Sequence, residues 1–228
     1  MTLQEVSMAR TQLSTEEMSA RYRQLYTGAI ADVLDDKGLW HQIVDKRIQP
    51  LTLEMRVAGP AITMLGRPER STDRAIRKGV KAVDAIKPHT VAVMDCSGEE
   101  VTGHWGELLT NGAMVRGGTG AVIDGGIRDT AAILALKFPV YAKYRSPADA
   151  KGRWNVVDFE CPVKIGGVAV LPGDFVVGDA DGVVIVPAEL AVEVLLESEE
   201  CVRTEAEIRK RVLQGESLAQ LYMQYERF

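Results

Sequence analysis

Two kinds of apolar pattern alternate along the first part of the chain. Unbroken apolar runs at 90–95 and 121–124 predict buried strands. Apolar residues at helical spacing, together with capping signals, predict several helices: one from the Ser14 capping box, one that ends at Gly38, and 71–86, 107–116 and 130–136. In the helix over 71–86, the expected apolar face consists of Ala75, Val80, Val83 and Ile86. The alternation predicts an α/β fold.

The pattern changes near Pro139, beyond which the chain is rich in strands. Gly and Pro turns separate apolar runs at 140–143, 155–159, 163–165, 168–171 and 183–186. The remaining segment predicts a long charged helix over 188–214 and a further helix over 217–225. The long helix carries a narrow apolar stripe, which either packs on its own domain or contacts a partner.

Length and composition predict one domain over 1–228, because 228 residues with 46% hydrophobic content can bury a sizeable core. Residues 1–26 are expected to be a helical N-terminal extension, and 188–228 a C-terminal helical segment for oligomerisation. A net charge of -5 and a pI near 5.4 argue against a nucleic-acid groove. No run approaches the roughly 20 apolar residues that span a bilayer, so no membrane contact is expected. Three widely spaced cysteines favour a reduced, cytoplasmic setting, with Cys96 as a packed residue.

The candidate chemistry is concentrated where two predicted strands end. The strand over 121–124 is followed by Gly125-Gly126, which we interpret as a turn, and then by Arg128-Asp129 directly before a helix. In open α/β sheets, ligands bind at the carboxyl ends of the strands. Arg128 offers a planar cation to a carbonyl or enolate oxygen, and Asp129 offers a hard oxygen ligand to a divalent cation.

The loop after the strand over 90–95 leads into the helix that begins at Glu107. Gly103 and Gly106 keep this loop free of bulky side chains. The amide groups of Glu107, Leu108 and Leu109, unpaired in the first helical turn, can therefore face a small anion such as a carboxylate.

Each of these signals has an ordinary structural alternative. Asp129 after a Gly-Gly turn and before a helix is often only an N-cap, and Arg128 alone is more often a surface arginine. Gly106-Glu107 alone is an ordinary helix start with a favourable charge near the positive end of the dipole. The residues alone leave an anion site and a coincidence about equally probable.

Glu107 is followed by twenty residues and then by Arg128-Asp129. This spacing resembles the motif of the class II pyruvate aldolases that act on 4-hydroxy-4-methyl-2-oxoglutarate and 4-carboxy-4-hydroxy-2-oxoadipate, which share their fold with the regulator of ribonuclease E activity A. The usual acid is Asp, so Glu107 is a departure from the motif. The resemblance also covers 27–34, 58–63 and 171–187, and extends roughly from Thr27 to the carboxyl terminus. It implies a swivelling β/β/α domain, of the α/β class, with flanking N-terminal and C-terminal helices.

The resemblance implies retro-aldol or decarboxylation chemistry through a pyruvate enolate, with Mg²⁺ or Mn²⁺ as the cofactor. Asp129 would be the direct metal ligand, and water and substrate oxygens would fill most other positions, as suits Mg²⁺. Arg128 would hold the C2 oxygen and stabilise the enolate. The amides of Leu108 and Leu109, after Gly106, would bind the pyruvyl carboxylate.

Two glutamates complete the implied site. Glu107 would orient a water that takes the proton from the C4 hydroxyl and later returns it to the enolate. Its extra methylene moves the carboxylate by roughly one bond length, and a displacement of that size can cost about a hundredfold in rate. The resemblance also implies a homotrimer or homohexamer with the site at a subunit boundary, where Glu205 is the best candidate for an acid supplied by the neighbouring subunit.

Other residues near the motif have a functional and a structural interpretation. His104 is equally consistent with proton transfer and with a structural role. Lys151 and Arg153 could meet the distal carboxylate of a dicarboxylic substrate, although a surface turn is the better interpretation. Asp179 and Asp181 resemble a metal pair but fit hairpin-turn residues better.

The sequence therefore predicts a metal-dependent lyase that releases pyruvate from a 4-hydroxy-2-oxo acid and decarboxylates oxaloacetate as a side activity. The alternative is a non-enzymatic regulator that binds a ribonuclease through its oligomer surface, which the retention of Arg128-Asp129 disfavours. A methyltransferase is the third interpretation and ranks last, because the chain lacks a Gly-rich nucleoside fingerprint with an acidic ribose partner.

Overall fold

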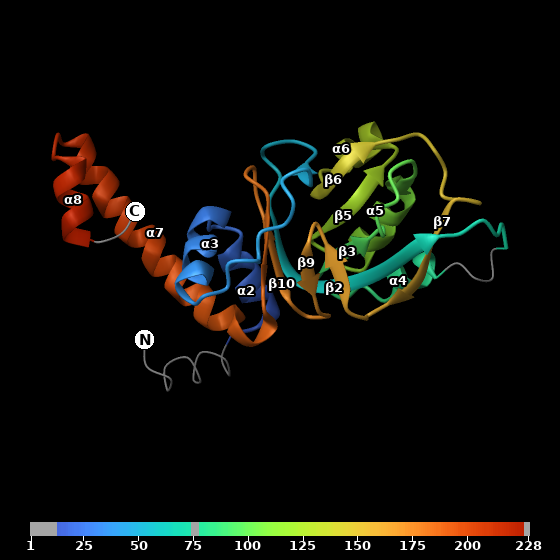
Figure 1. The fold of residues 1–228 in the computed structure, drawn as a ribbon, viewed down its shortest axis with the longest axis horizontal. Coiled ribbons are helices and arrows are strands. Elements are labelled where there is room, and N and C mark those ends of the chain that lie inside the picture. Colours follow the sequence, from blue (N-terminus) through green and yellow to red (C-terminus); the bar gives the residue numbers. More distant parts are fainter. Residues whose placement is uncertain (1–12, 74–77, 226–228) are drawn as a thin grey trace.

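The computed structural model describes residues 13–73 and 78–225, which are built around one mixed β-sheet (Figure 1). The strands follow the order β1-β6-β5-β3-β2-β10-β11, with β4 paired to β5 and β7 paired to β2. Strands β2, β3, β5 and β6 are parallel to one another, so their carboxyl ends lie at one edge of the sheet. The strand bounds are β1 (Gln49–Pro50), β2 (Val57–Pro68), β3 (Val91–Asp95), β4 (Gly103–Trp105), β5 (Gly120–Ile127), β6 (Val140–Arg145), β7 (Trp154–Phe159), β10 (Phe175–Gly178) and β11 (Val183–Val186).

Three groups of elements cover this sheet. Helices α4 (Gly79–Asp84), α5 (Glu107–Val115) and α6 (Thr130–Leu136) enclose an apolar cluster that includes Met94 and Ile123. A second cluster includes residues of the hairpin formed by β8 (Val163–Ile165) and β9 (Val168–Val170). A third joins α2 (Thr15–Tyr22), α3 (Thr27–Asp36) and the first part of α7 (Ala191–Leu213) to β10 and β11.

Most predicted elements are confirmed, and their bounds follow from the tertiary pairing. The Ser14 capping box is present, with the Ser14 hydroxyl accepting from the Glu17 amide. The predicted strand over 58–63 is the first half of β2, which continues to Pro68 because β7 pairs with its second half. The β10–β11 hairpin closes the sheet edge as the resemblance implied.

The prediction of a turn at Gly125-Gly126 is wrong, because both glycines lie inside β5. A Cβ at Gly125 would lie 2.6 Å from His104 Nδ1, and one at Gly126 would lie 2.2 Å from the Tyr144 ring. The glycines therefore permit close packing of strands, not a reversal of the chain. The segment Gly103–Trp105, expected to be a loop, is the short strand β4 and pairs in parallel with β5.

The predicted helix over 71–86 is also too long, because only α4 (Gly79–Asp84) forms within the described part. Residues 71–73 lack helix, and the side chains of Glu69 and Ser71 accept hydrogen bonds from backbone amides two residues ahead. Such local bonds compete with helical pairing. Ala75 of the expected apolar face lies outside the described residues, and Val80 is 65% exposed instead of packed in the core.

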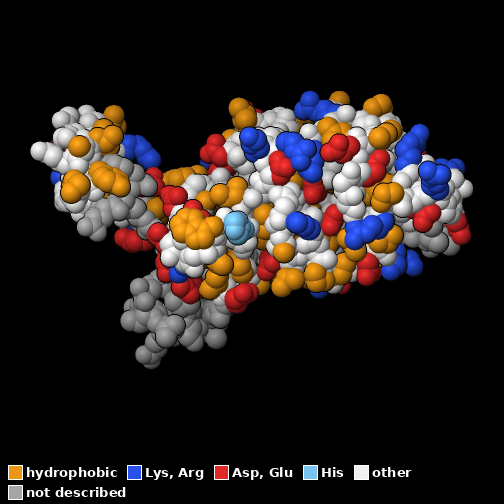
Figure 2. Space-filling view, in the orientation of Figure 1, with side chains coloured by type: hydrophobic (Ala, Val, Ile, Leu, Met, Phe, Trp, Pro, Cys, Tyr) orange, Lys and Arg blue, Asp and Glu red, His pale blue; other side chains and the backbone are white. Residues whose placement is uncertain are grey.

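The C-terminal helices are confirmed and extend away from the sheet (Figure 1). A short 3-10 helix, η1 (Ala188–Leu190), precedes α7, and α8 (Leu218–Tyr225) follows it. We call the end of α7 together with α8 the C-terminal arm. Its exposed apolar side chains are Leu213, Leu218, Tyr222 and Met223. Figure 2 shows apolar side chains both on the arm and, among acidic and basic ones, on the body. No helix among the described residues combines the length and the apolar character needed to cross a bilayer.

Candidate active site

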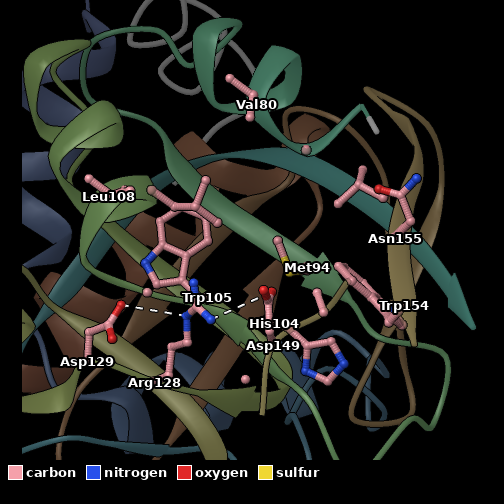
Figure 3. A pocket seen from close by; sticks show the side chains of 16 residues that line it. Val80, Met94, His104, Trp105, Leu108, Arg128, Asp129, Asp149, Trp154 and Asn155 are labelled. Carbon is pink, nitrogen blue, oxygen red and sulfur yellow. Dashed lines mark ion pairs between the residues drawn. The ribbon is translucent and has the colours of Figure 1, made fainter. Parts of the chain in front are cut away.

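Parallel pairing of β4 with β5 brings the two halves of the sequence motif together. Trp105 lies opposite Ile127, and the Arg128 amide donates to the Trp105 carbonyl at 2.9 Å. The chain then continues into α5 from one strand and into α6 from the other. Gly106 and Arg128-Asp129 consequently meet where the two strands end. Figure 3 shows the neighbouring Trp105 together with Arg128 and Asp129.

Asp129 is the residue before α6, as the N-cap interpretation required, but its side chain makes no cap on that helix. Its backbone is left-handed, with φ 57°, which is uncommon for a residue other than glycine and clusters at functional sites. In this conformation Oδ2 accepts from the Glu107 amide at 3.2 Å, at the amino terminus of α5. The carboxylate therefore lies where the N–H groups of α5 attract an anion.

The Arg128 guanidinium lies between two carboxylates. Its Nε is 3.7 Å from Asp129 Oδ2, and one terminal nitrogen is 3.6 Å from Asp149 Oδ1 (Figure 3). The sequence analysis missed Asp149, which lies in the segment between β6 and β7. Its Oδ1 also accepts from the Lys151 amide at 3.3 Å and so forms a local Asp turn. In the sequence, such a turn is the signal that Asp149 carries, and it does not point to the cavity.

These residues line a cavity of about 410 Å³, within the range of small-molecule sites. The predicted Gly106, Leu108, Leu109, Arg128 and Asp129 all line it. The remaining walls include residues that sequence analysis did not select, because they come from α4, β3 and β7. They include Val80, Met94, Trp154, Asn155 and Val156.

Glu107 is beside this cavity and does not line it. Its carboxylate contacts the side-chain amide of Asn111, one turn along α5. Glu107 instead lines an adjoining surface hollow with Leu108 and Asp129. The structure thus brings the Glu107 backbone to Asp129, while the Glu107 carboxylate points toward Asn111.

His104 is buried and lines the cavity, with both ring nitrogens in polar contact. Nδ1 accepts from the Gly126 amide at 3.1 Å, and Nε2 lies 2.9 Å from a Glu99 carboxylate oxygen. The neutral ring therefore carries its proton on Nε2. Burial lowers the pKa of His104, and the nearby Glu99 carboxylate opposes this effect only in part. The geometry favours the structural interpretation of His104.

The donor set fits a divalent cation that keeps most of its water. Asp129 presents a hard carboxylate whose side chain is 45% exposed beside the cavity. The described residues contain no cluster of three His, Cys, Asp or Glu that could enclose a metal ion. A single carboxylate supplemented by water and substrate oxygens suits Mg²⁺, which dehydrates reluctantly.

The other candidate residues do not line the cavity. Asp179 accepts from the amide and hydroxyl of Thr27, both at 2.8 Å, and from the Asp181 amide, so the turn interpretation is confirmed. Lys151 is in a surface turn. Arg153 is part of the same turn and donates to the Asp149 carbonyl. Cys96 is fully buried, as expected.

Glu205 lies on α7, on the far side of the sheet from α5 and α6 (Figure 1). Its carboxylate accepts from the Tyr26 hydroxyl of the same chain. Its role toward a neighbouring subunit stays a prediction.

The family model described as RraA-like, Aldolase/RraA, matches residues 27–185. The chain belongs to the RraA-like family. The matched region contains the whole polar side of the cavity, including Arg128 and Asp129.

Two relatives of this chain differ in name and in the length that the match covers. A protein of Halalkalibacterium halodurans named "Putative 4-hydroxy-4-methyl-2-oxoglutarate aldolase" is 34% identical over 167 residues, 73% of this chain and 75% of that protein. Protein DlpA of Legionella pneumophila is 30% identical over 196 residues, 86% of this chain and 32% of DlpA. The chain thus spans about a third of the length of DlpA.

The structure of Streptomyces coelicolor RraAS2, described as an unusual member of the RNase ES inhibitor RraA protein family, has a TM-score of 0.76 to this RraA-like chain. It is 27% identical and covers 85% of this chain and 96% of its own. The predicted α/β fold with flanking helices is therefore confirmed. The RraA-like family includes proteins named as aldolases and RraA-type regulators.

Proposed function

We propose that the protein is a divalent-metal-dependent lyase that cleaves a 4-hydroxy-2-oxo acid to pyruvate and a second carbonyl compound. Oxaloacetate decarboxylation is the expected side activity, because it passes through the same enolate. One observation carries the proposal: Arg128 and Asp129 lie in the wall of a cavity, beside the amino terminus of α5. A fixed cation, a hard carboxylate and a helix amino terminus suit the binding of a small oxo acid.

Substrate binding is assigned to the first turn of α5 and to Arg128. Leu108 and Leu109 are in the first turn of α5, where amide groups have no acceptor within the helix, and both residues line the cavity. Their amides would hold the pyruvyl carboxylate. The Arg128 guanidinium would donate to the C2 oxygen, whose negative charge grows in the transition state.

In the cleavage step, the C3–C4 bond breaks and its electron pair passes into the pyruvate enolate. The C4 hydroxyl loses its proton and becomes the carbonyl group of the second product. Glu107 would take this proton through a water and return it to C3, so no proton is gained or lost overall. An Mg²⁺ or Mn²⁺ ion held by Asp129 would supply further positive charge near the developing oxyanion.

Metal removal tests the proposal directly. Protein stripped with a chelator should lose pyruvate release from oxaloacetate and regain it with Mg²⁺ or Mn²⁺, measured with coupled lactate dehydrogenase. The metal salt without protein gives the background rate. Activity that is indifferent to chelation would refute the metal assignment.

Asp129→Ala should abolish turnover, since it removes the proposed metal ligand. The matched control is Asp84→Ala, which removes an exposed carboxylate that pairs with Arg116 on the surface. Near-native turnover by Asp129→Ala would show that the site is wrongly assigned.

The similarity to RraAS2 supports one competing function, a non-enzymatic regulator that binds a ribonuclease. Arg128-Asp129 at the cavity favours the lyase. The ranking would reverse if the metal-loaded protein turned over no 2-oxo acid and the purified protein inhibited an E-type ribonuclease.

A further inference from the structure

The cavity has two chemically different ends. Arg128, Asp129 and Asp149 form a charged end, and mainly apolar side chains, together with the uncharged Asn155, form the other (Figure 3). Figure 3 shows Val80 and Trp154 away from the Arg128-Asp129 pair. A pyruvyl unit bound by Arg128 and α5 would therefore extend its C4 substituent toward the apolar end.

Trp154 gives this apolar end a fixed shape. Its indole N–H donates to the Cys96 carbonyl at 3.2 Å, and its ring meets the His104 ring edge-on at a centroid distance of 4.6 Å. The ring also covers Gly66, where a Cβ would lie 1.7 Å from it. Three contacts from three different segments hold the ring, so the wall is preorganised.

The rest of the apolar end combines a buried floor with an exposed rim. Met94 and Val156 are almost fully buried beneath the cavity. On the rim, the side chains of Val80 and Leu108 are 65% and 78% exposed. A bound apolar group would remove both of these side chains from water, which favours binding.

Positive charge lies at the opposite end of the cavity. Arg128 is the one Lys or Arg among the described residues that line it, and it already faces the two carboxylates of Asp129 and Asp149. A second carboxylate on the substrate would lose water at the apolar end and gain no cationic partner from those residues. An uncharged apolar group gives up little favourable hydration when it enters that end of the cavity.

We propose that the physiological substrates are 4-hydroxy-2-oxo acids whose C4 carries an uncharged, apolar group. Cleavage of the C3–C4 bond would then release pyruvate and an apolar aldehyde or ketone, not a second oxo acid. This inference rests on the proposed lyase function and specifies the substrate class of that same site.

A matched pair of substrates tests it. Racemic 4-hydroxy-5-methyl-2-oxohexanoate carries an isopropyl group at C4, and racemic 4-hydroxy-2-oxoglutarate carries a carboxylate of similar shape there. With Mg²⁺ present, kcat/KM for pyruvate release should be about 10- to 100-fold higher for the isopropyl compound, the usual range for a fit in an apolar pocket.

A separate measurement tests the chemistry at the charged end of the cavity without involving the apolar end. Exchange of the pyruvate methyl protons in D₂O, followed by proton NMR, requires enolate formation and involves no C4 group. If exchange occurs and the carboxylate compound is cleaved as well as or better than its partner, the substrate inference is wrong and the lyase proposal stands. If the protein catalyses neither exchange nor cleavage, the lyase proposal fails and the inference fails with it.

Val80→Lys should shift the ratio of the two kcat/KM values at least tenfold toward the carboxylate compound, because it places a cation at the apolar end. The matched control is Val115→Lys on the exposed surface of α5, where the valine is 86% exposed and does not line the cavity. An unchanged ratio in Val80→Lys, with exchange of pyruvate protons retained, would contradict the assignment of this wall.

Discussion

The two walls of the cavity differ in how the chain builds them. The polar wall comes from the ends of β4 and β5, which pair in parallel with a register shift between Gly103 and Trp105 and carry Gly106, Arg128 and Asp129 on adjacent turns. The apolar wall needs β7, whose partner β2 lies about 90 residues earlier, so that Trp154 is opposite Pro68. The proposed chemistry thus depends on one local pairing, and the proposed specificity depends on long-range packing.

Both walls also depend on a glycine at which a Cβ would collide with a functional side chain. At Gly106 it would lie 2.6 Å from Asp129 Oδ2, and at Gly66 it would lie 1.7 Å from the Trp154 ring. Gly106→Ala therefore perturbs the polar wall, and Gly66→Ala perturbs the apolar wall. Neither substitution replaces a residue of the opposite wall. The pair gives a direct way to test whether the walls act independently.

The largest effect is expected from Arg128→Ala, which removes the cation at the proposed oxyanion. Loss of one such donor lowers kcat by about 10²- to 10³-fold. The measurement is exchange of pyruvate methyl protons in D₂O, with Arg116→Ala as control because Arg116 pairs with Asp84 on the surface. Equal rates in the two variants would remove Arg128 from the chemistry.

Gly106→Ala should lower proton exchange by about a hundredfold, because it displaces the Asp129 carboxylate and small misplacements carry costs of that size. The backbone at Gly106 is extended, with φ −155°, so alanine adds no backbone strain. Gly28→Ala is the control, since its Cβ would meet only Tyr26 at an ordinary 3.5 Å. An active Gly106→Ala protein would mean that the position of Asp129 is unimportant.

This contrast explains what the sequence could predict. The polar wall is encoded in contiguous signals, namely apolar runs, a helix start and the spacing from Glu107 to Arg128. Trp154 and Val80 carry no such signal, because their position depends on the pairing of β7 with β2 and on the short length of α4. The glycines at 125 and 126 suggested a turn, since a sequence does not reveal the His104 and Tyr144 rings that require them.

Gly66→Ala should affect stability and specificity more than chemistry. Forcing a methyl group against the Trp154 ring is overpacking, which typically costs about 1–3 kcal/mol in the free energy of unfolding. Denaturant unfolding measures this loss, again with Gly28→Ala as control. The preference for the isopropyl substrate over the carboxylate substrate should fall, while proton exchange in the folded protein continues. Parallel loss of exchange and preference would show that the two walls are coupled.

The smallest effect concerns His104, which connects the two walls through Gly126 and Trp154. Burial holds its pKa in the folded protein below the 6.5 of the free side chain. As the pH falls through about 6.5, the unfolded chain takes up a proton that the folded protein resists, so this site lowers stability only on the acid side. At one pH unit below 6.5 the loss of unfolding free energy is at most about 1.4 kcal/mol.

Gln at position 104 can accept from Gly126 and donate to Glu99 without titrating, so His104→Gln should reduce the loss of unfolding free energy between pH 7.5 and 5.5. His41→Gln, at an exposed histidine, is the control, and an equal pH dependence in both variants would mean that His104 does not resist protonation in the folded state.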